Sequence, residues 1–215
     1  MSTFICSPTY SQAWQRIATC HLSGKSPEGP RHLRLLGQPG VGKTFILEQY
    51  AGDHPRVEAP DRITVPVLVV PIPSAPTLKG LYHAILNSLG VRTVDGHNLE
   101  SLRFRVVTLI RNLGVELLLL DEINHLLDRG RHRSHEAVTD GLKQLIDSIG
   151  IPTVFAGALR SKQLFDANAQ LRSRVTTCHT MLPFDLSGSC EALSRLGCRS
   201  HIRRHSANGC RLQMW

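Results

Sequence analysis

Residues 37–44, GQPGVGKT, match the pattern G-x-x-x-x-G-K-[ST]. Its glycines let the backbone curl tightly, so that successive N–H groups can face the oxygens of a phosphate. Lys43 would reach the outer phosphates of a nucleotide, and Thr44 would offer a hydroxyl to Mg²⁺. The alternative is a chance match in a glycine-rich turn. We therefore predict that ATP and Mg²⁺ bind at Gly37, Gln38, Pro39, Gly40, Val41, Gly42, Lys43 and Thr44.

An acidic pair supplies the second half of such a site. Asp121 and Glu122 end the apolar run that begins at residue 115. Asp121 would hold Mg²⁺ together with Thr44, partly through water. Glu122 would orient or deprotonate an attacking water molecule, so it is the predicted catalytic acid–base residue beside Lys43. A solvated acidic turn after a strand is the alternative.

Basic and polar residues elsewhere could contact anions. Arg172 and Arg174 precede the last expected strand, and an arginine there could enter a neighbouring subunit's site and stabilise charge on the terminal phosphate. Two surface arginines are the alternative. Possible contacts with the DNA backbone, each of which could instead be a solvated charge or a helix cap, are Thr77, Lys79, Arg129, Arg131 and Arg133.

The expected elements place these residues. Strand, loop and helix around residues 37–44 form the context that a phosphate loop requires. The alternation of strands and helices predicts a doubly wound, mostly parallel α/β sheet with five strands. Strands are expected at 31–36, 62–72, 115–122, 151–158 and 175–182. Helices are expected at 7–22, 43–51, 76–90, 98–114 and 134–150, with a partly helical segment at 161–174.

Composition narrows the class of protein. The 215 residues carry a net charge of +8, which favours nucleic acid or another anionic partner. The longest apolar run, residues 117–120, is far shorter than the roughly 20 residues of a membrane span, so we expect no membrane partner and a cytoplasmic location. The six cysteines are then expected as free thiols. Cysteines and histidines near the C-terminus match no zinc module in their spacing.

Several stretches together resemble a known family. These are GQPGVGKT, VPVLVVPIPSAPTLKGLYHAILNSLG, LLLLDEINHLL, IPTVFAGALRSKQLFDANAQLRSRV and MLPF. In this order they resemble TniB-type transposition proteins, which are AAA+ ATPases of bacterial mobile elements similar to the IstB and TnsC helper ATPases. The resemblance covers residues 7–184.

The resemblance implies an ATP-dependent regulator of transposition. Such proteins assemble into oligomers on double-stranded target DNA with ATP bound, recruit the transposase, and disassemble when ATP is hydrolysed. The resemblance also implies that Arg174 is an arginine finger that acts on a neighbouring subunit. More loosely, it implies that Thr77 and Lys79 lie where related ATPases touch the DNA backbone.

The chain departs from the family in two places. Gly157-Ala158 stands where relatives have Gly-Thr, whose polar side chain senses the terminal phosphate. Residues 185–215 form a basic tail with three cysteines and do not resemble the family's helical lid domain. We therefore expect an N-terminal helix and loop at 1–30, an ATP-binding core at 31–184, and a divergent, poorly ordered tail at 185–215. Weak ATP affinity and weak ATPase activity would follow, and a frameshifted or truncated gene is our hypothesis for the tail.

Two other functions stay open. One is a degenerate remnant that neither hydrolyses ATP nor assembles, although it could still bind intact relatives. The other is an AAA+ ATPase that loads a helicase. A P-loop kinase of small molecules is disfavoured, because it would not need Glu122 as a water activator.

Overall fold

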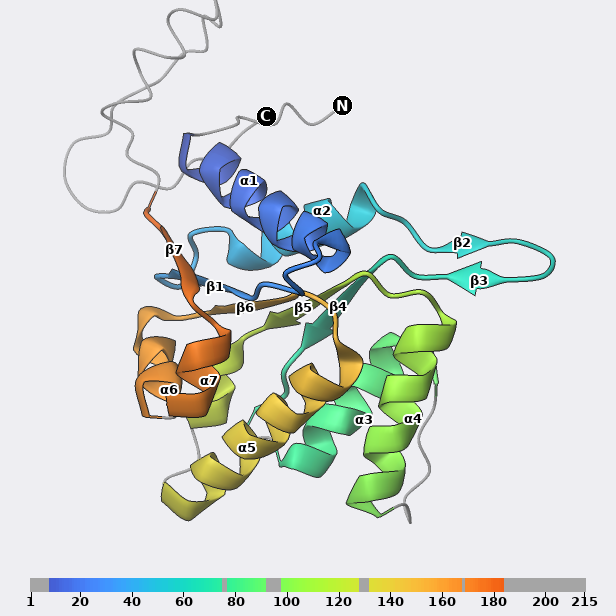
Figure 1. Cartoon of the computed structure of the whole chain (residues 1–215). Coiled ribbons are helices and arrows are strands. Elements are labelled where there is room, and N and C mark those ends of the chain that lie inside the picture. The colour runs from blue at the N-terminus through green and yellow to red at the C-terminus, as the bar shows by residue number, and fades with distance from the viewer. Residues whose placement is uncertain (1–7, 75–76, 92–97, 128–131, 168, 184–215) are drawn as a thin grey trace, which may run out of the picture. The chain divides into compact units, whose positions relative to one another are not determined.

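The computed structural model describes residues 8–74, 77–91, 98–127, 132–167 and 169–183, without the side chains of 132–137, 167, 169 and 170. Its centre is a five-stranded sheet in the order β4-β5-β6-β1-β7, and each neighbouring pair is parallel (Figure 1). The predicted five-stranded, doubly wound fold is confirmed. The strands are β1 (Leu33–Gly37), β4 (Val67–Pro71), β5 (Leu117–Asp121), β6 (Thr153–Gly157) and β7 (Thr177–Met181).

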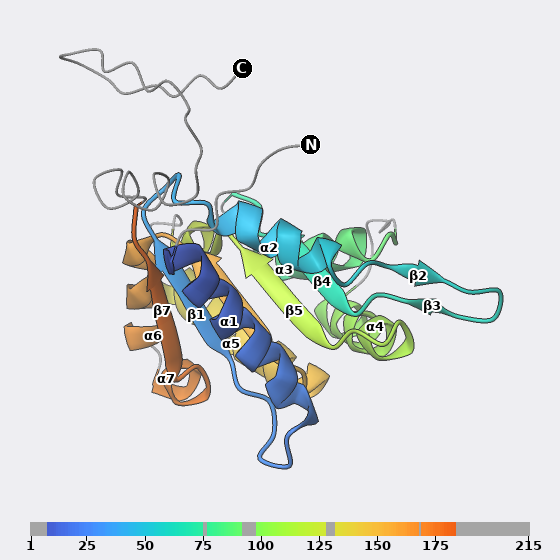
Figure 2. The ribbon, with the colours of Figure 1, turned by 90° about the horizontal axis from the view of Figure 1, so that it is seen from above.

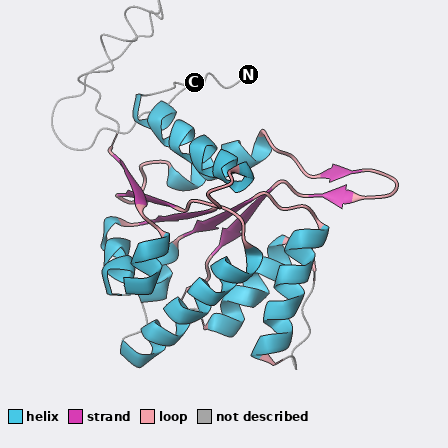
Figure 3. Cartoon of the chain, in the orientation of Figure 1, coloured by secondary structure: helices cyan, strands magenta, loops and turns pink. Residues whose placement is uncertain are grey.

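Helices cover both faces of the sheet (Figures 2 and 3). One face carries α1 (Pro8–Leu22) and α2 (Lys43–Gly52). The other face carries α3 (Leu78–Ser88), α4 (Leu99–Asn112), α5 (His132–Ile149), and the short helices α6 (Lys162–Ala167) and α7 (Ala169–Arg174). The structure also has three short 3-10 turns: η1 (Ser23–Lys25), η2 (Ile123–Leu127) and η3 (Leu159–Ser161).

The apolar run of β5 is continuous because the strand is buried on both faces. Side chains alternate between the two faces of a strand. Leu117 and Leu119 accordingly join the core under α1 and α2, whereas Leu118 and Leu120 join the core under α3, α4 and α5. All four are 0% exposed. Burial on both sides therefore fixes β5 in the middle of the fold and fixes where its acidic end lies.

The expected strand at 62–72 is in fact two strands that Pro66 separates. β3 (Ile63–Thr64) pairs in antiparallel fashion with β2 (Val57–Glu58) in a small hairpin, and only β4 belongs to the main sheet. Proline has no N–H to donate to a ladder. The Pro66 carbonyl still accepts from the N–H groups of Glu116 and Leu117, at 2.8 and 3.0 Å, and so starts the pairing of β4 with β5.

None of the helices in the described part of the chain has both the length and the apolarity to span a membrane.

The turn η2 follows β5, and its residues pack closely against the end of β6. A Cβ on Gly157 would lie 2.7 Å from Ile123 Cγ1, 2.9 Å from Ser161 Oγ and 3.2 Å from Asn124 Oδ1. Such contacts are too short for carbon. The absence of a side chain at position 157 therefore lets the ends of β5 and β6 approach one another.

His32 is a buried titratable residue directly before β1. It is 5% exposed, and its Nδ1 has no hydrogen-bond partner among the described residues. Burial lowers the pKa of His32 to about 4, with a further lowering from Arg174 and an opposing effect from Asp147. The imidazole is therefore neutral in the folded protein at neutral pH.

We predict that Gly157→Ala destabilises the protein by about 1–3 kcal/mol, because an added methyl group would overpack the contact between η2 and β6. Chemical denaturation measures this change. The control is Gly52→Ala at the end of α2, where an added Cβ meets no atom within 4 Å and the effect should stay within about 1 kcal/mol. Equal stability of the two variants would contradict the predicted close contact.

We also predict that His32 makes stability depend on pH in acid. The folded-state pKa of about 4 lies below the ordinary value of 6.5, so the unfolded chain takes up the proton first as the pH falls. The unfolding free energy should fall by about 3 kcal/mol between pH 6.5 and pH 4 and change no further through this group below that range. Denaturant titrations of the wild type and His32→Gln should diverge in this window, and parallel curves would contradict the prediction.

Candidate functional site

The loop between β1 and α2 contains the glycine-rich motif. Gly40 and Gly42 have φ values of 81° and 89°, in the left-handed region that glycine adopts without strain. A Cβ on either residue would meet no atom within 4 Å, so the space beside the loop is open. The backbone of the loop thus has both the curvature and the free space that a phosphate group needs.

Lys43 is the first residue of α2 and lies beside this loop. Its Nζ donates to the carbonyl oxygens of Gly37 and Gln38, at 3.1 and 2.9 Å, and the residue is 7% exposed. Burial lowers the pKa of Lys43, while Glu122 and Asp121 act in the opposite direction. The two acidic residues from β5 and its turn are therefore close enough to act on the lysine electrostatically.

A hydrogen bond joins the two halves of the predicted site. Thr44 Oγ1 donates to Asp121 Oδ2 at 2.6 Å, although the two residues are 77 positions apart in the chain. Asp121 is 4% exposed, and its other oxygen accepts from the N–H of Glu122 at 2.8 Å. A hydroxyl and a carboxylate that meet in this way are oxygen ligands of the kind that Mg²⁺ prefers, so these residues fit the metal.

Glu122 has an unusual backbone. Its φ is 58°, and it is the only non-glycine residue with a positive φ in the part of the chain that the structure describes. Such a conformation costs about 1–3 kcal/mol and is concentrated at functional sites. The residue is half-buried and follows Asp121 directly, so the strained backbone turns the chain at the acidic end of β5.

The sequence analysis missed Asn124, which lies in η2. Asn124 is 7% exposed, and its Oδ1 accepts from the N–H of Ala158 at 3.2 Å. The neighbouring His125 Nδ1 lies 2.8 Å from the carbonyl oxygen of Ile72, just after β4. The turn after the acidic pair is thus tied to both strands that flank β5. In the sequence, the signal for a functional role of Asn124 was the position of this turn directly after Asp121 and Glu122.

Arg174 does not lie near the glycine-rich loop of its own chain. It precedes β7, whose last residue Met181 pairs with Gly37, so Arg174 is at the opposite edge of the sheet from the loop. β7 alone separates these edges by about 13 Å. Arg174 Nη2 pairs with Asp147 Oδ2 at 3.1 Å, and both side chains are partly exposed. The described chain therefore does not bring Arg174 to its own glycine-rich loop.

The residues predicted to contact DNA are only partly described. Thr77 is the N-cap of α3, where its Oγ1 accepts from the N–H of Gly80 at 2.9 Å, as expected for the helix-cap alternative. Lys79 is half-buried on the first turn of α3. Arg129, Arg131 and the side chain of Arg133 lie outside the described residues. The tail at 185–215, where the lid was expected to be missing, also lies outside them.

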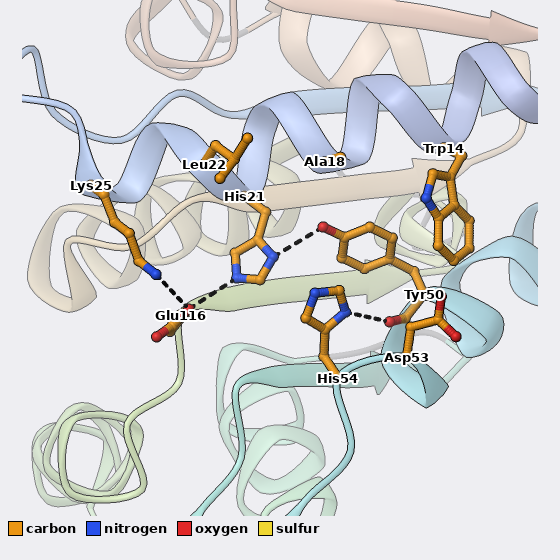
Figure 4. A pocket seen from close by; sticks show the side chains of 9 residues that line it. All are labelled: Trp14, Ala18, His21, Leu22, Lys25, Tyr50, Asp53, His54 and Glu116. Atoms are coloured by element: carbon orange, nitrogen blue, oxygen red, sulfur yellow. Dashed lines mark hydrogen bonds and ion pairs between the residues drawn. The ribbon is translucent and has the colours of Figure 1, made fainter.

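A cavity of about 430 Å³ lies between the C-terminal ends of α1 and α2 (Figure 4). His21 Nδ1 lies 3.0 Å from the hydroxyl of Tyr50, and Glu116 Oε2 lies 3.4 Å from His21 Nε2 and 3.5 Å from Lys25 Nζ. Glu116 precedes β5, whereas Asp121 ends it, so this cavity is at the other edge of the sheet from Lys43. It is separate from the loop and from the acidic pair.

Three solved structures with a similar fold share little sequence with the chain. Cdc6p from Pyrobaculum aerophilum matches with a TM-score of 0.61 and 16% identity, over 87% of this chain and 48% of that one. The ORC2 protein of Aeropyrum pernix, in ADPNP–ADP complexes, matches with a TM-score of 0.63 and 18% identity, over 89% and 51%. The ORC1 protein of Aeropyrum pernix, in complex with DNA, matches with a TM-score of 0.58 and 21% identity, over 89% and 50%.

The chain thus spans about half the length of these structures, and at such low identity they show the fold alone. No curated protein matches the sequence. The family model described as bacterial TniB protein matches residues 3–182, which is most of the chain. With its phosphate-loop motif, its five-stranded parallel sheet and this match, the chain belongs to the TniB family and has the fold of AAA+ ATPases.

Proposed function

We propose that this chain is an ATP-dependent switch that binds double-stranded DNA and recruits or activates a transposase. In this proposal ATP and Mg²⁺ favour assembly of several copies on DNA, and hydrolysis releases them. The family match over residues 3–182 supports the role in transposition. The observation that carries the nucleotide-dependent part is the 2.6 Å hydrogen bond between Thr44 and Asp121, which joins a phosphate loop to an acidic strand end.

Each residue at this edge has a distinct role in the proposal. The N–H groups of residues 37–44 bind the phosphates, and Lys43 neutralises their outer oxygens. Thr44 and Asp121 hold Mg²⁺, which supplies further positive charge at the transferred phosphate. Glu122 orients the attacking water and accepts its proton. Burial of Lys43 and Asp121 strengthens these electrostatic interactions, because they are poorly screened by water.

Arg174 has its proposed role between copies of the chain. It lies at the edge of the sheet opposite the loop, and its guanidinium could stabilise charge on a nucleotide that a neighbouring copy holds. In the isolated chain it pairs with Asp147, and an exposed pair of this kind is worth at most about 1 kcal/mol. Assembly can therefore break the pair at little cost.

In this proposal the protein contacts the phosphate groups of the DNA backbone and not the bases. The net charge of +8 and the position of Lys79 on the first turn of α3 support binding that does not depend on base sequence. Arg129, Arg131 and Arg133 are proposed to add to this binding, and the N–H groups at the start of α3 near Thr77 have the polarity that attracts a phosphate.

A degenerate remnant is the second candidate function. The specific observation in its favour is Ala158, which places a methyl group at the end of β6, where a polar side chain would sense the terminal phosphate. A remnant would bind DNA through its positive charge alone, and nucleotide would have no effect on that binding.

We predict that the wild type retains double-stranded DNA at least about tenfold better with Mg²⁺–ATP than with ADP, and that Lys43→Ala abolishes this difference because it removes the charge that binds the outer phosphates. Filter binding at fixed salt measures the retention. Lys25→Ala is the matched control, because it removes the same charge at the opposite edge of the sheet, and it should keep the ATP effect. Retention that depends on neither nucleotide nor Lys43 would support the remnant.

We also predict that Arg174→Ala lowers ATP hydrolysis on DNA by about 10³-fold. An equimolar mixture with Lys43→Ala should regain activity, because one variant supplies the intact loop and the other supplies the arginine. Steady-state phosphate release measures both effects. Arg172→Ala, which removes an exposed arginine from the same helix, should behave like the wild type. A mixture no more active than its components would rule out action of Arg174 between subunits.

A further inference from the structure

The cavity between the ends of α1 and α2 has no part in the roles above, although aromatic rings line it (Figure 4). The ring centroids of Trp14 and Tyr50 are 4.9 Å apart, and the rings of Tyr50 and His54 are stacked at 4.7 Å. An aromatic ring carries partial negative charge on its faces, which attracts cations. A row of three rings therefore favours a ligand with positive charge.

The charged side chains of the cavity favour the same kind of ligand. The carboxylates of Asp53, at the end of α2, and Glu116, directly before β5, lie on the two sides of the Tyr50 and His54 rings (Figure 4). Against them stands Lys25, whose Nζ is 3.5 Å from Glu116. The lining thus has an excess of negative charge in a chain of net charge +8, which suits a cation and not the phosphates of DNA.

His21 adds no positive charge to the cavity at neutral pH. Burial is the main cause that lowers its pKa from the ordinary 6.5, with further lowering from His54 and Lys25 and an opposing effect from Glu116. His21 Nε2 is 3.4 Å from Glu116 Oε2, yet within the described chain it makes no hydrogen bond. The imidazole therefore lies beside Glu116 without neutralising its charge.

Apolar surface continues beyond the cavity along the two helices. Leu22, which lines the cavity, is 70% exposed. Toward the other end of α1, Tyr10 stacks on Trp14 with centroids 6.0 Å apart and lies 6.4 Å from the ring of Phe45, which is 43% exposed. From Tyr10 to Leu22 the helix extends about 18 Å, which is much longer than a single small cation. A surface of this length suits a segment of a protein.

We propose that this cavity binds an arginine side chain of a protein partner, with the guanidinium against the aromatic rings and paired with Glu116. A guanidinium is planar, stacks on rings and offers two parallel N–H groups to a carboxylate, whereas an ammonium group does neither. Apolar side chains of the same partner would pack on Leu22 and Phe45.

The existing pair of Lys25 and Glu116 is no obstacle to this binding. Both side chains are exposed, at 73% and 47%, and an exposed ion pair contributes little to stability. An incoming guanidinium can therefore replace Lys25 beside Glu116. The cavity is at the other edge of the sheet from Lys43, so the inference does not depend on the binding of ATP.

Titration of the full chain with N-acetyl-arginine amide tests the proposal. Its neutral counterpart of the same shape, N-acetyl-citrulline amide, is the matched control. The NMR signal of the Trp14 indole N–H reports binding, and Trp14→Phe distinguishes it from that of Trp215, the other tryptophan. We expect the arginine probe to shift the Trp14 signal at millimolar concentration and to bind at least about tenfold more tightly than the citrulline probe, because citrulline has no charge.

Three variants test the charges of the cavity. Glu116→Gln should weaken binding of the arginine probe about fivefold or more, because the charge-assisted pair is lost. Lys25→Ala should strengthen it about two- to threefold, because a competing cation is removed. Glu48→Gln removes an exposed carboxylate from α2 outside the cavity and should leave the affinity unchanged.

Several outcomes would overturn the inference. One is a Trp14 signal that does not shift with the arginine probe at about 20 mM, and another is equal binding of the arginine and citrulline probes. Unchanged affinity in Glu116→Gln would also do so. N-acetyl-lysine amide and spermidine are titrated in parallel. Binding of either as tightly as the arginine probe would overturn the assignment to an arginine side chain.

Discussion

The hydrogen bond between Thr44 and Asp121 depends on one constraint, the parallel register of the sheet. β1 and β5 both pair with β6, and all three strands run in the same direction. Their carboxyl ends therefore meet at one edge, and the loop after β1 faces the acidic end of β5 across β6. A parallel sheet needs both faces covered, and the two separate cores on β5 meet this need. Burial of leucines on both sides of β5 thus holds a carboxylate against a threonine hydroxyl 77 residues away.

Much of this arrangement could be predicted from the sequence. The continuous apolar run before Asp121 indicated a strand buried on both faces, and the glycine-rich motif between an expected strand and helix placed Lys43 at the start of α2. These patterns are local, because the residues that form each strand, loop or helix lie next to one another in the sequence. Pro66 was a local signal too, and its missing N–H explains why β3 and β4 are separate strands.

Other features could not be predicted, because they depend on contacts between distant segments. The bond from Ala158 to Asn124 joins two turns 34 residues apart, and no pattern in either turn indicates the other. Arg174 was expected from resemblance, but its pairing with Asp147 depends on how α5 and α7 pack. The positive φ of Glu122 is set by the turn that η2 must make, and glutamate itself has no preference for it.

The backbone at Glu122 also bears on the stability of the chain. A glutamate held at a φ of 58° costs stability, which glycine or asparagine at the same position would recover. The residue in this chain is still the costly one, beside an intact Asp121 and Lys43. The turn after β5 thus holds a carboxylate beside Asp121 at a cost in stability of about 1–3 kcal/mol.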